Sequence, residues 1–101
     1  MRYSLIFSQL ASEDLTEALG WYKSQNVHGL EKRFIEAMSK VLKRLELNPE
    51  LYPFAHKNVR QAFLSTFPYK IIYWIDDATN EVNIIAVIHR ARDPKVWKKR
   101  L

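Results

Sequence analysis

The sequence predicts an α+β fold in which an N-terminal strand and a helical hairpin precede a three-stranded antiparallel meander. Two apolar patterns with helical spacing cover residues 10–24 and 30–47. Two later runs rich in β-branched and aromatic residues cover 67–76 and 82–88. The polar segment 77–81 between these runs predicts a hairpin. Both faces of each run are largely apolar, which places this hairpin in the middle of a sheet that is covered on both sides.

The N-terminal part of the chain is expected to form one strand and two helices. Residues 3–7 predict a short strand, and Ser8 is placed to cap the first helix. Asn26 or Gly29 is expected to take the left-handed conformation that often follows a helix. The acidic residues early in the first helix are interpreted as solvated charges favoured by the helix dipole and are assigned no chemistry: Glu13, Asp14 and Glu17.

The second half of the chain is expected to hold the other strands. Residues 49–53 predict a turn, and residues 59–64 predict the strand before the central hairpin. In the last strand, strict alternation divides the apolar residues into one face with Ile84, Ala86 and Ile88 and a second face with Ile85 and Val87. The same alternation puts Arg90 on the first face and His89 on the second.

A basic segment ends the chain. Asp93 and Pro94 predict the start of a short helix, with Trp97 as its apolar anchor. Six of the sixteen Lys and Arg residues lie between Arg90 and Arg100, where Asp93 is the one acidic residue. The segment therefore carries a large share of the excess positive charge.

Length and composition predict one domain over residues 1–101 and an anionic partner. The net charge is +5, and 48% of the residues are hydrophobic. The chain has no cysteine, and its three His residues have no spaced carboxylate partners, so we expect neither a metal site nor a cofactor. No signal peptide or membrane-spanning run is evident, which predicts a soluble cytoplasmic protein without membrane contact.

The order of elements and several spaced motifs together resemble the RelE/ParE superfamily of type II toxin-antitoxin toxins, which includes proteins called plasmid stabilisation toxins. The resemblance covers essentially the whole chain. The motifs are Ala11-x-x-Asp14-Leu15, Asn48-Pro49-x-x-Tyr52-Pro53, Arg60 followed by Phe67-Pro68-Tyr69-x-Ile71-x-Tyr73, and His89-x-x-Arg92-x-Pro94-x-x-Trp97-x-x-Arg100.

The resemblance implies a toxin that arrests growth and is neutralised by a cognate antitoxin. The antitoxin's C-terminal segment is expected to wrap the toxin, and its N-terminal part is expected to bind operator DNA. The resemblance also implies a helical hairpin on one face of the sheet and a concave basic surface on the other. Two branches of activity are open: RelE-like toxins cleave mRNA on the ribosome, whereas ParE-like toxins poison DNA gyrase.

The nuclease branch would make the protein an enzyme with clustered cations and a proton-transfer group. Cleavage by the 2′-hydroxyl needs a base, an acid and positive charge near the phosphate. Arg60, His89 and Arg90 are the catalytic candidates under this hypothesis, and Lys57 matches a further basic position of the family's set. His56 is an alternative proton-transfer residue. The departure from the nuclease pattern is Trp97, because indole cannot act as an acid or base where the family has a Tyr.

The gyrase branch needs shape, charge and an anchor rather than proton transfer. We favour it because the C-terminal pattern looks closer to ParE-like members, and because Trp and Arg often anchor interfaces. The candidate binding residues are Lys57, Arg92, Trp97, Lys98 and Arg100. A third hypothesis is a non-toxic member that only binds its antitoxin and acts as a co-repressor.

Overall fold

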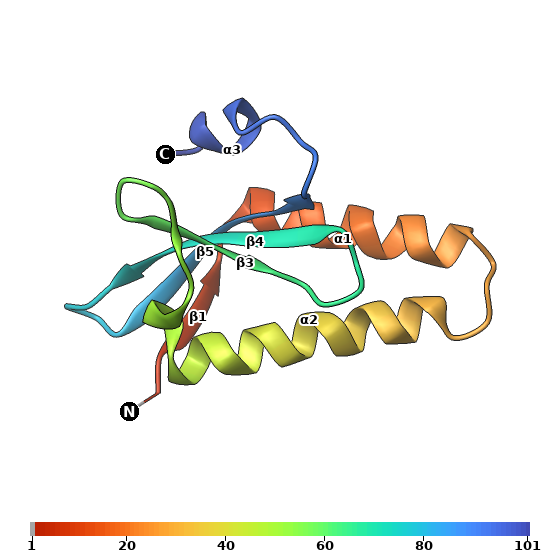
Figure 1. The fold of residues 1–101 in the computed structure, drawn as a ribbon, viewed down its shortest axis with the longest axis horizontal. Coiled ribbons are helices and arrows are strands. Elements are labelled where there is room, and N and C mark those ends of the chain that lie inside the picture. Colours follow the sequence, from red (N-terminus) through yellow and green to blue (C-terminus); the bar gives the residue numbers. More distant parts are fainter. Residues whose placement is uncertain (1) are drawn as a thin grey trace.

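A five-stranded sheet forms the middle layer of the molecule, in the order β1-β5-β4-β3-β2 (Figure 1). The computed structural model describes residues 2–101. β1 runs parallel to β5, and all other neighbouring strands are antiparallel. The α+β class and the central position of the β4–β5 hairpin are therefore confirmed. The strands are β1 (Ser4–Phe7), β2 (Phe54–His56), β3 (Val59–Phe63), β4 (Tyr69–Asp76) and β5 (Glu81–His89).

Two antiparallel helices, α1 (Gln9–Ser24) and α2 (Leu30–Leu47), cover one face of the sheet, as predicted. Ser8 caps α1 by accepting a hydrogen bond from the backbone N–H of Ala11 at 3.1 Å. In the turn between the helices, Asn26 and Gly29 both have positive φ, at 54° and 75°. Within residues 2–101, no helix has the length and apolar character needed to cross a bilayer.

The main core lies between the helical hairpin and the sheet. Aromatic rings pack at one end of this core. Tyr22 of α1 stacks on Phe34 of α2 with ring centroids 4.7 Å apart, and the Phe67 ring lies nearly perpendicular to both. At the other end, the hydroxyl of Tyr73 donates to the carbonyl oxygen of Pro49 at 2.5 Å. Burial raises the pKa of Tyr73, so this phenol stays protonated and keeps its donor role.

A β-bulge in β5 changes which side chains face the helices. Ile72 pairs with Ala86 and the next residue, Tyr73, pairs with Ile84, so Ile85 is an extra residue on β5. The prediction of strict alternation is therefore wrong. Ile84 and Val87 face the helices, whereas Ile85, Ala86 and Ile88 belong to the opposite face. Beyond the bulge, His89 follows the face of Val87 and Arg90 follows that of Ala86 and Ile88.

The opposite face of the sheet carries a smaller core under the short helix α3 (Lys95–Lys98), which lies across the sheet from α2 in Figure 1. Trp97 anchors this helix and is only 2% exposed among Val59, Ile72 and Ile88. Asp93 accepts a hydrogen bond from the backbone N–H of Lys95 at 2.9 Å. The helix starts one residue later than predicted, because Pro94 and not Asp93 is at its N-cap position. The expected concave basic surface is thus largely an apolar face with α3 on it.

Two small elements were missed in the sequence. The 3-10 helix η1 (Pro49–Leu51) lies within the expected turn at 49–53, and the edge strand β2 lies in the segment after it, to which no element was assigned. β2 returns directly into β3 through a turn at 57–58 in which Lys57 has a φ of 50°. A strand of three residues is too short to show alternation, so its sequence carries no strand pattern. These elements form one edge of the sheet.

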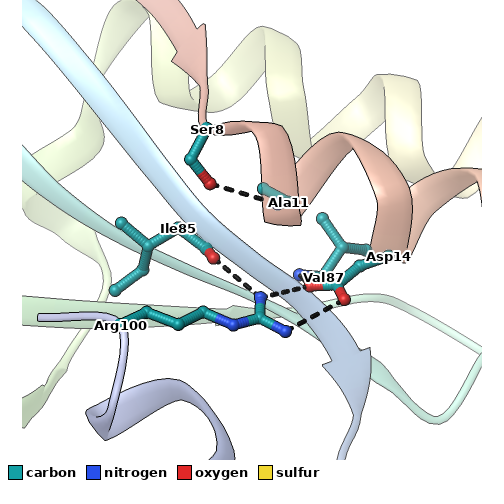
Figure 2. A network of polar contacts seen from close by, with 6 residues as sticks. All are labelled: Ser8, Ala11, Asp14, Ile85, Val87 and Arg100. Atoms are coloured by element: carbon teal, nitrogen blue, oxygen red, sulfur yellow. Dashed lines mark hydrogen bonds and ion pairs between the residues drawn. The ribbon is translucent and has the colours of Figure 1, made fainter.

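Asp14 joins α1, β5 and the C-terminal segment (Figure 2). Its carboxylate forms a two-point ion pair with Arg100, with N–O distances of 2.6 and 3.2 Å. Asp14 Oδ2 also accepts the backbone N–H of Val87 at 3.0 Å, and Arg100 Nη1 donates to the carbonyl oxygen of Ile85 at 2.9 Å. Both side chains are about 15% exposed. The interpretation of Asp14 as a solvated charge is therefore wrong.

We expect Asp14→Ala to lower the free energy of unfolding by about 2 kcal/mol, because it leaves the Val87 N–H and the Arg100 guanidinium without their charged partner in a mostly buried site. Urea unfolding measures this change. Glu13→Ala is the matched control, since Glu13 is exposed one residue earlier and should change stability by less than ~0.5 kcal/mol.

Amide exchange gives a second readout of the same prediction. The Val87 N–H should exchange faster in Asp14→Ala than in Glu13→Ala, because only the first substitution removes its acceptor. Equal stability and equal Val87 exchange in the two variants would contradict a structural role for Asp14.

Candidate functional site

Arg60, the first catalytic candidate, is held against η1 and β2. Its Nη1 donates to the carbonyl oxygens of Glu50 and Tyr52 at 3.0 and 2.6 Å, and the guanidinium lies 3.8 Å from the centre of the Phe54 ring. Arg60 pairs with Tyr73 across the sheet, so it lies on the helix side. These contacts link Arg60 to η1 and β2, and they leave its Nε and Nη2 atoms available to donate to a further partner.

His89 lies at the end of β5, far along the same side of the sheet. Its Nδ1 accepts the backbone N–H of Ala91 at 3.0 Å, and its ring lies 5.7 Å from that of Tyr69. His89 pairs with Tyr69, whereas Arg60 pairs with Tyr73, which is four residues further along β4. At 3.4 Å per residue the two positions are separated by roughly 14 Å along the strand alone. Arg60 bonds to the Glu50 and Tyr52 carbonyl oxygens and His89 to the Ala91 N–H, so the structure does not bring the two side chains together.

Arg90 projects to the opposite face of the sheet from His89. Its guanidinium lies 4.3 Å from the centre of the Phe63 ring. Phe63 pairs with Lys70, and Lys70 pairs with Ile88, so these side chains form one row on the face that α3 partly covers. The three catalytic candidates therefore occupy three separate places, and their catalytic role stays a prediction.

Lys70 is the polar residue that sequence reasoning missed. It is 7% exposed and is the one buried charged residue of 2–101. Burial, and to a smaller extent the nearby Arg90 guanidinium, lower the pKa of Lys70. The available signal was a Lys within an otherwise apolar central strand, between Tyr69 and Ile71.

Lys70, Arg90 and Phe63 together form a cationic end of the open sheet face. Two cations beside an aromatic ring suit an anionic group such as a phosphate or carboxylate. Of these two cations, Lys70 is the one whose pKa is lowered by burial. No group of three or more His, Cys, Asp or Glu side chains within 2–101 is arranged to hold a metal ion.

Three of the predicted binding residues lie around α3. The Lys98 ammonium lies 6.0 Å from the centre of the Trp97 ring. The ring of His56, the residue before Lys57, lies 6.4 Å from the same Trp97 ring. Trp97 itself is buried, and its indole N–H has no hydrogen-bond partner. It holds α3 in place, so a partner would meet the exposed Lys98 and Lys57 first.

The other two predicted binding residues lie at the side of the molecule near α1. Arg100 is engaged with Asp14, whereas Arg92 is exposed and lines a small cavity of ≈ 50 Å³ with Glu17, Tyr69 and His89. Burial and the Glu17 carboxylate raise the pKa of Tyr69, while Arg92 lowers it. Arg92 is therefore an exposed cation without an ion pair in this part of the C-terminal segment.

Comparison with known proteins finds matches to toxins of type II toxin-antitoxin systems. The fold is similar to a chain of the chromosomal ParDE system from P. aeruginosa, with a TM-score of 0.72, 16% identity, and coverage of 87% of this chain and 96% of that one. It is also similar to a mutant of the E. coli toxin RelE in the free state, with a TM-score of 0.63, 20% identity, and coverage of 100% and 99%.

A third similar structure is the toxin-antitoxin complex RelBE2 from Mycobacterium tuberculosis, with a TM-score of 0.62, 23% identity, and coverage of 89% of this chain and 100% of that one. Identities this low establish the fold alone. A comparison with curated protein sequences finds no significant match. The family model described as the ParE toxin of the type II toxin-antitoxin system parDE matches residues 5–94. The chain therefore belongs to the ParE toxin family within the RelE/ParE superfamily.

Proposed function

We propose that this protein inhibits DNA gyrase and is neutralised by a cognate antitoxin. The observation that carries the proposal is the match of the ParE toxin family over residues 5–94, which include the sheet, the helical hairpin and the start of the C-terminal segment. The separation of Arg60, His89 and Arg90 adds support, because a gyrase inhibitor needs a shaped and charged surface rather than a shared catalytic centre.

The exposed side of the C-terminal segment is the proposed gyrase contact. Arg92 and Lys98 are both exposed, while Trp97 and Arg100 fix the segment to the sheet and to α1. A rigidly held basic surface loses little conformational entropy when it binds a partner. The two anchors therefore fix the backbone from which the free cations project.

An antitoxin is the second proposed partner. Similar folds occur in the toxin-antitoxin complex RelBE2 from Mycobacterium tuberculosis and in the RelE-RelB complex from Pyrococcus horikoshii. In the proposed system, operator DNA is bound only through the antitoxin. The proposed site of action is the cytoplasm, where gyrase is present.

Ribosome-dependent mRNA cleavage is the alternative, and Lys70 is the observation that favours it. A partly desolvated amine beside Arg90 supplies a base of lowered pKa and a second cation on one open surface. This pair differs from the set that the sequence suggested, because Lys70 takes the place of Arg60 and His89.

A decisive experiment has to avoid substitutions that disturb the fold. Truncation after Asp93 would remove Trp97 and Arg100 together, and so expose the apolar sheet face and break the pair with Asp14. Loss of activity in that truncation would not separate binding from folding. Exposed cations are better positions, because their removal leaves the core intact.

In a supercoiling assay with purified gyrase, we expect Arg92→Ala/Lys98→Ala to weaken inhibition at least tenfold, since about 1.4 kcal/mol of interface energy corresponds to that factor. Lys23→Ala/Lys32→Ala is the charge-matched control at the turn between α1 and α2, away from α3 (Figure 1). It should inhibit like the unmodified protein, and added antitoxin should restore supercoiling. Growth arrest without any effect on gyrase would contradict the proposal.

We expect Lys70→Met to raise the free energy of unfolding at pH 7 by about 1 kcal/mol, because methionine has no charge to desolvate. The folded pKa of Lys70 lies below the unfolded value of 10.5. At a pH below the folded pKa, Lys70 is protonated in both the folded and the unfolded protein, and the folded protein bears the full cost of burying the charged ammonium. Between the folded and the unfolded pKa this cost falls progressively, because the folded protein can release the proton. The gain in the free energy of unfolding from Lys70→Met should therefore shrink as the pH rises toward 10.5.

The same variant separates the two activities. Under the gyrase proposal, Lys70→Met keeps its inhibition of supercoiling. Under the nuclease alternative, it loses cleavage of ribosome-bound mRNA while it gains stability, as active-site substitutions often do. Lys70→Arg is the matched control that retains the charge but cannot act as a base near neutral pH.

A further inference from the structure

A second basic surface lies on α2, away from the C-terminal segment. A groove of ≈ 280 Å³ runs between α2 and the β3–β4 turn. Arg33, Lys40 and Arg44 line its helical wall, and Ser65 and Thr66 line its other wall. All five of these residues are exposed. We call this feature the α2 groove.

The cations of the α2 groove share one stripe of the helix and are free of ion pairs. Positions 33, 40 and 44 differ by seven and four residues, so their side chains project from the same face of α2. Within residues 2–101 the one ion pair closer than 4.0 Å is Asp14–Arg100, so none of the three is neutralised by a neighbour. Glu36 is the single carboxylate in the lining. The groove therefore carries a net positive charge.

The length of the groove matches a short nucleic-acid strand. Arg33 and Arg44 are eleven residues apart, which is roughly 16 Å along the helix axis and covers a few nucleotides of an extended single strand. Phe67 lines the groove and is half-buried, and its ring lies nearly perpendicular to those of Tyr22 and Phe34. A cationic groove beside an aromatic ring is the arrangement that holds single strands by phosphate contacts and base stacking.

The lining fits a phosphate chain better than an acidic peptide. An amphipathic peptide needs an apolar pocket for an anchoring side chain, but Val41 in the floor is only 3% exposed. A nucleic-acid strand gains affinity from every neutralised phosphate through counterion release, without such a pocket. The hydroxyl of Thr66 already donates to the carbonyl oxygen of Ser65 at 2.6 Å, which leaves the Ser65 hydroxyl as the free donor on that wall.

We propose that the α2 groove binds the sugar-phosphate backbone of single-stranded nucleic acid. Arg33, Lys40 and Arg44 contact phosphates spaced along the strand, Ser65 donates to the backbone from the opposite wall, and Phe67 offers a stacking surface. The site is separate from the Lys70–Arg90 cluster and from the exposed cations of the C-terminal segment. It does not depend on the gyrase proposal, because binding to an oligonucleotide is measured without either target.

The test is the salt dependence of binding to labelled 12-nucleotide oligothymidylate and oligouridylate, followed by fluorescence anisotropy between 25 and 200 mM KCl. Three phosphate contacts on a single strand contribute a slope of about −2 to log K against log[KCl]. The triple variant Arg33→Gln/Lys40→Gln/Arg44→Gln should bind at least tenfold more weakly at 50 mM KCl, with a slope shallower by about 2.

The matched control is Lys23→Gln/Lys32→Gln/Lys43→Gln, which removes the same net charge from exposed residues outside the α2 groove. It should bind with nearly the affinity and slope of the unmodified protein. Ser65→Glu tests the other wall without touching the helix, and should weaken binding severalfold, whereas Ser12→Glu on α1 should not. Thermal unfolding of each variant shows that the fold is retained.

The outcomes separate the proposal from its competitors. Equal binding of both oligonucleotides, or tighter binding of the RNA, supports backbone recognition, and the second result adds a 2′-hydroxyl contact. Equal weakening by the two triple variants would overturn the proposal, since only net charge would then matter. A glutamate-rich peptide that displaces the oligonucleotide at a lower concentration would also overturn it, in favour of an acidic protein segment.

Discussion

The open edge of β5 is the constraint on which the rest of the structure depends. β1 pairs with β5 only up to Ile84, so the following residues of β5 have no strand on that side. Unpaired backbone groups at a partly buried edge are costly. Asp14 accepts the Val87 N–H, Arg100 donates to the Ile85 carbonyl oxygen, and the two side chains pair with each other. One ion pair thereby satisfies these two backbone groups of β5 and joins α1 to the C-terminal segment (Figure 2).

The bulge at Ile85 sets the chemistry of the two sheet faces. Because side chains alternate along a strand, one extra residue moves every later side chain to the other face. Without the bulge, Arg90 would share the face of Ile84 and point toward α1. With it, Arg90 lies on the open face beside Lys70, and His89 lies by Tyr69 instead. The bulge therefore separates the histidine from the cations that a nuclease would need beside it.

Local patterns predicted most of the fold, and long-range contacts account for what they missed. The helices follow from apolar stripes, and the turn between them follows from Asn26 and Gly29, whose positive φ values are local properties. The pair Asp14–Arg100 joins residues 86 positions apart, so no local pattern contains it. The bulge depends on the register between β4 and β5, which composition does not fix. Lys70 was visible as a charge in an apolar strand, but its link to Arg90 required the fold.

The C-terminal segment has two tasks, and its residues divide between them. Trp97 and Arg100 hold the segment on the sheet and on α1, so they are not free to act first in recognition. Removing Trp97 from its site would expose about 200 Å² of aromatic surface, at a cost of roughly 5 kcal/mol from apolar area alone. A partner that leaves the segment in place avoids this cost and meets Arg92 and Lys98. The exposed cations are therefore available to a partner while the buried anchors keep the fold.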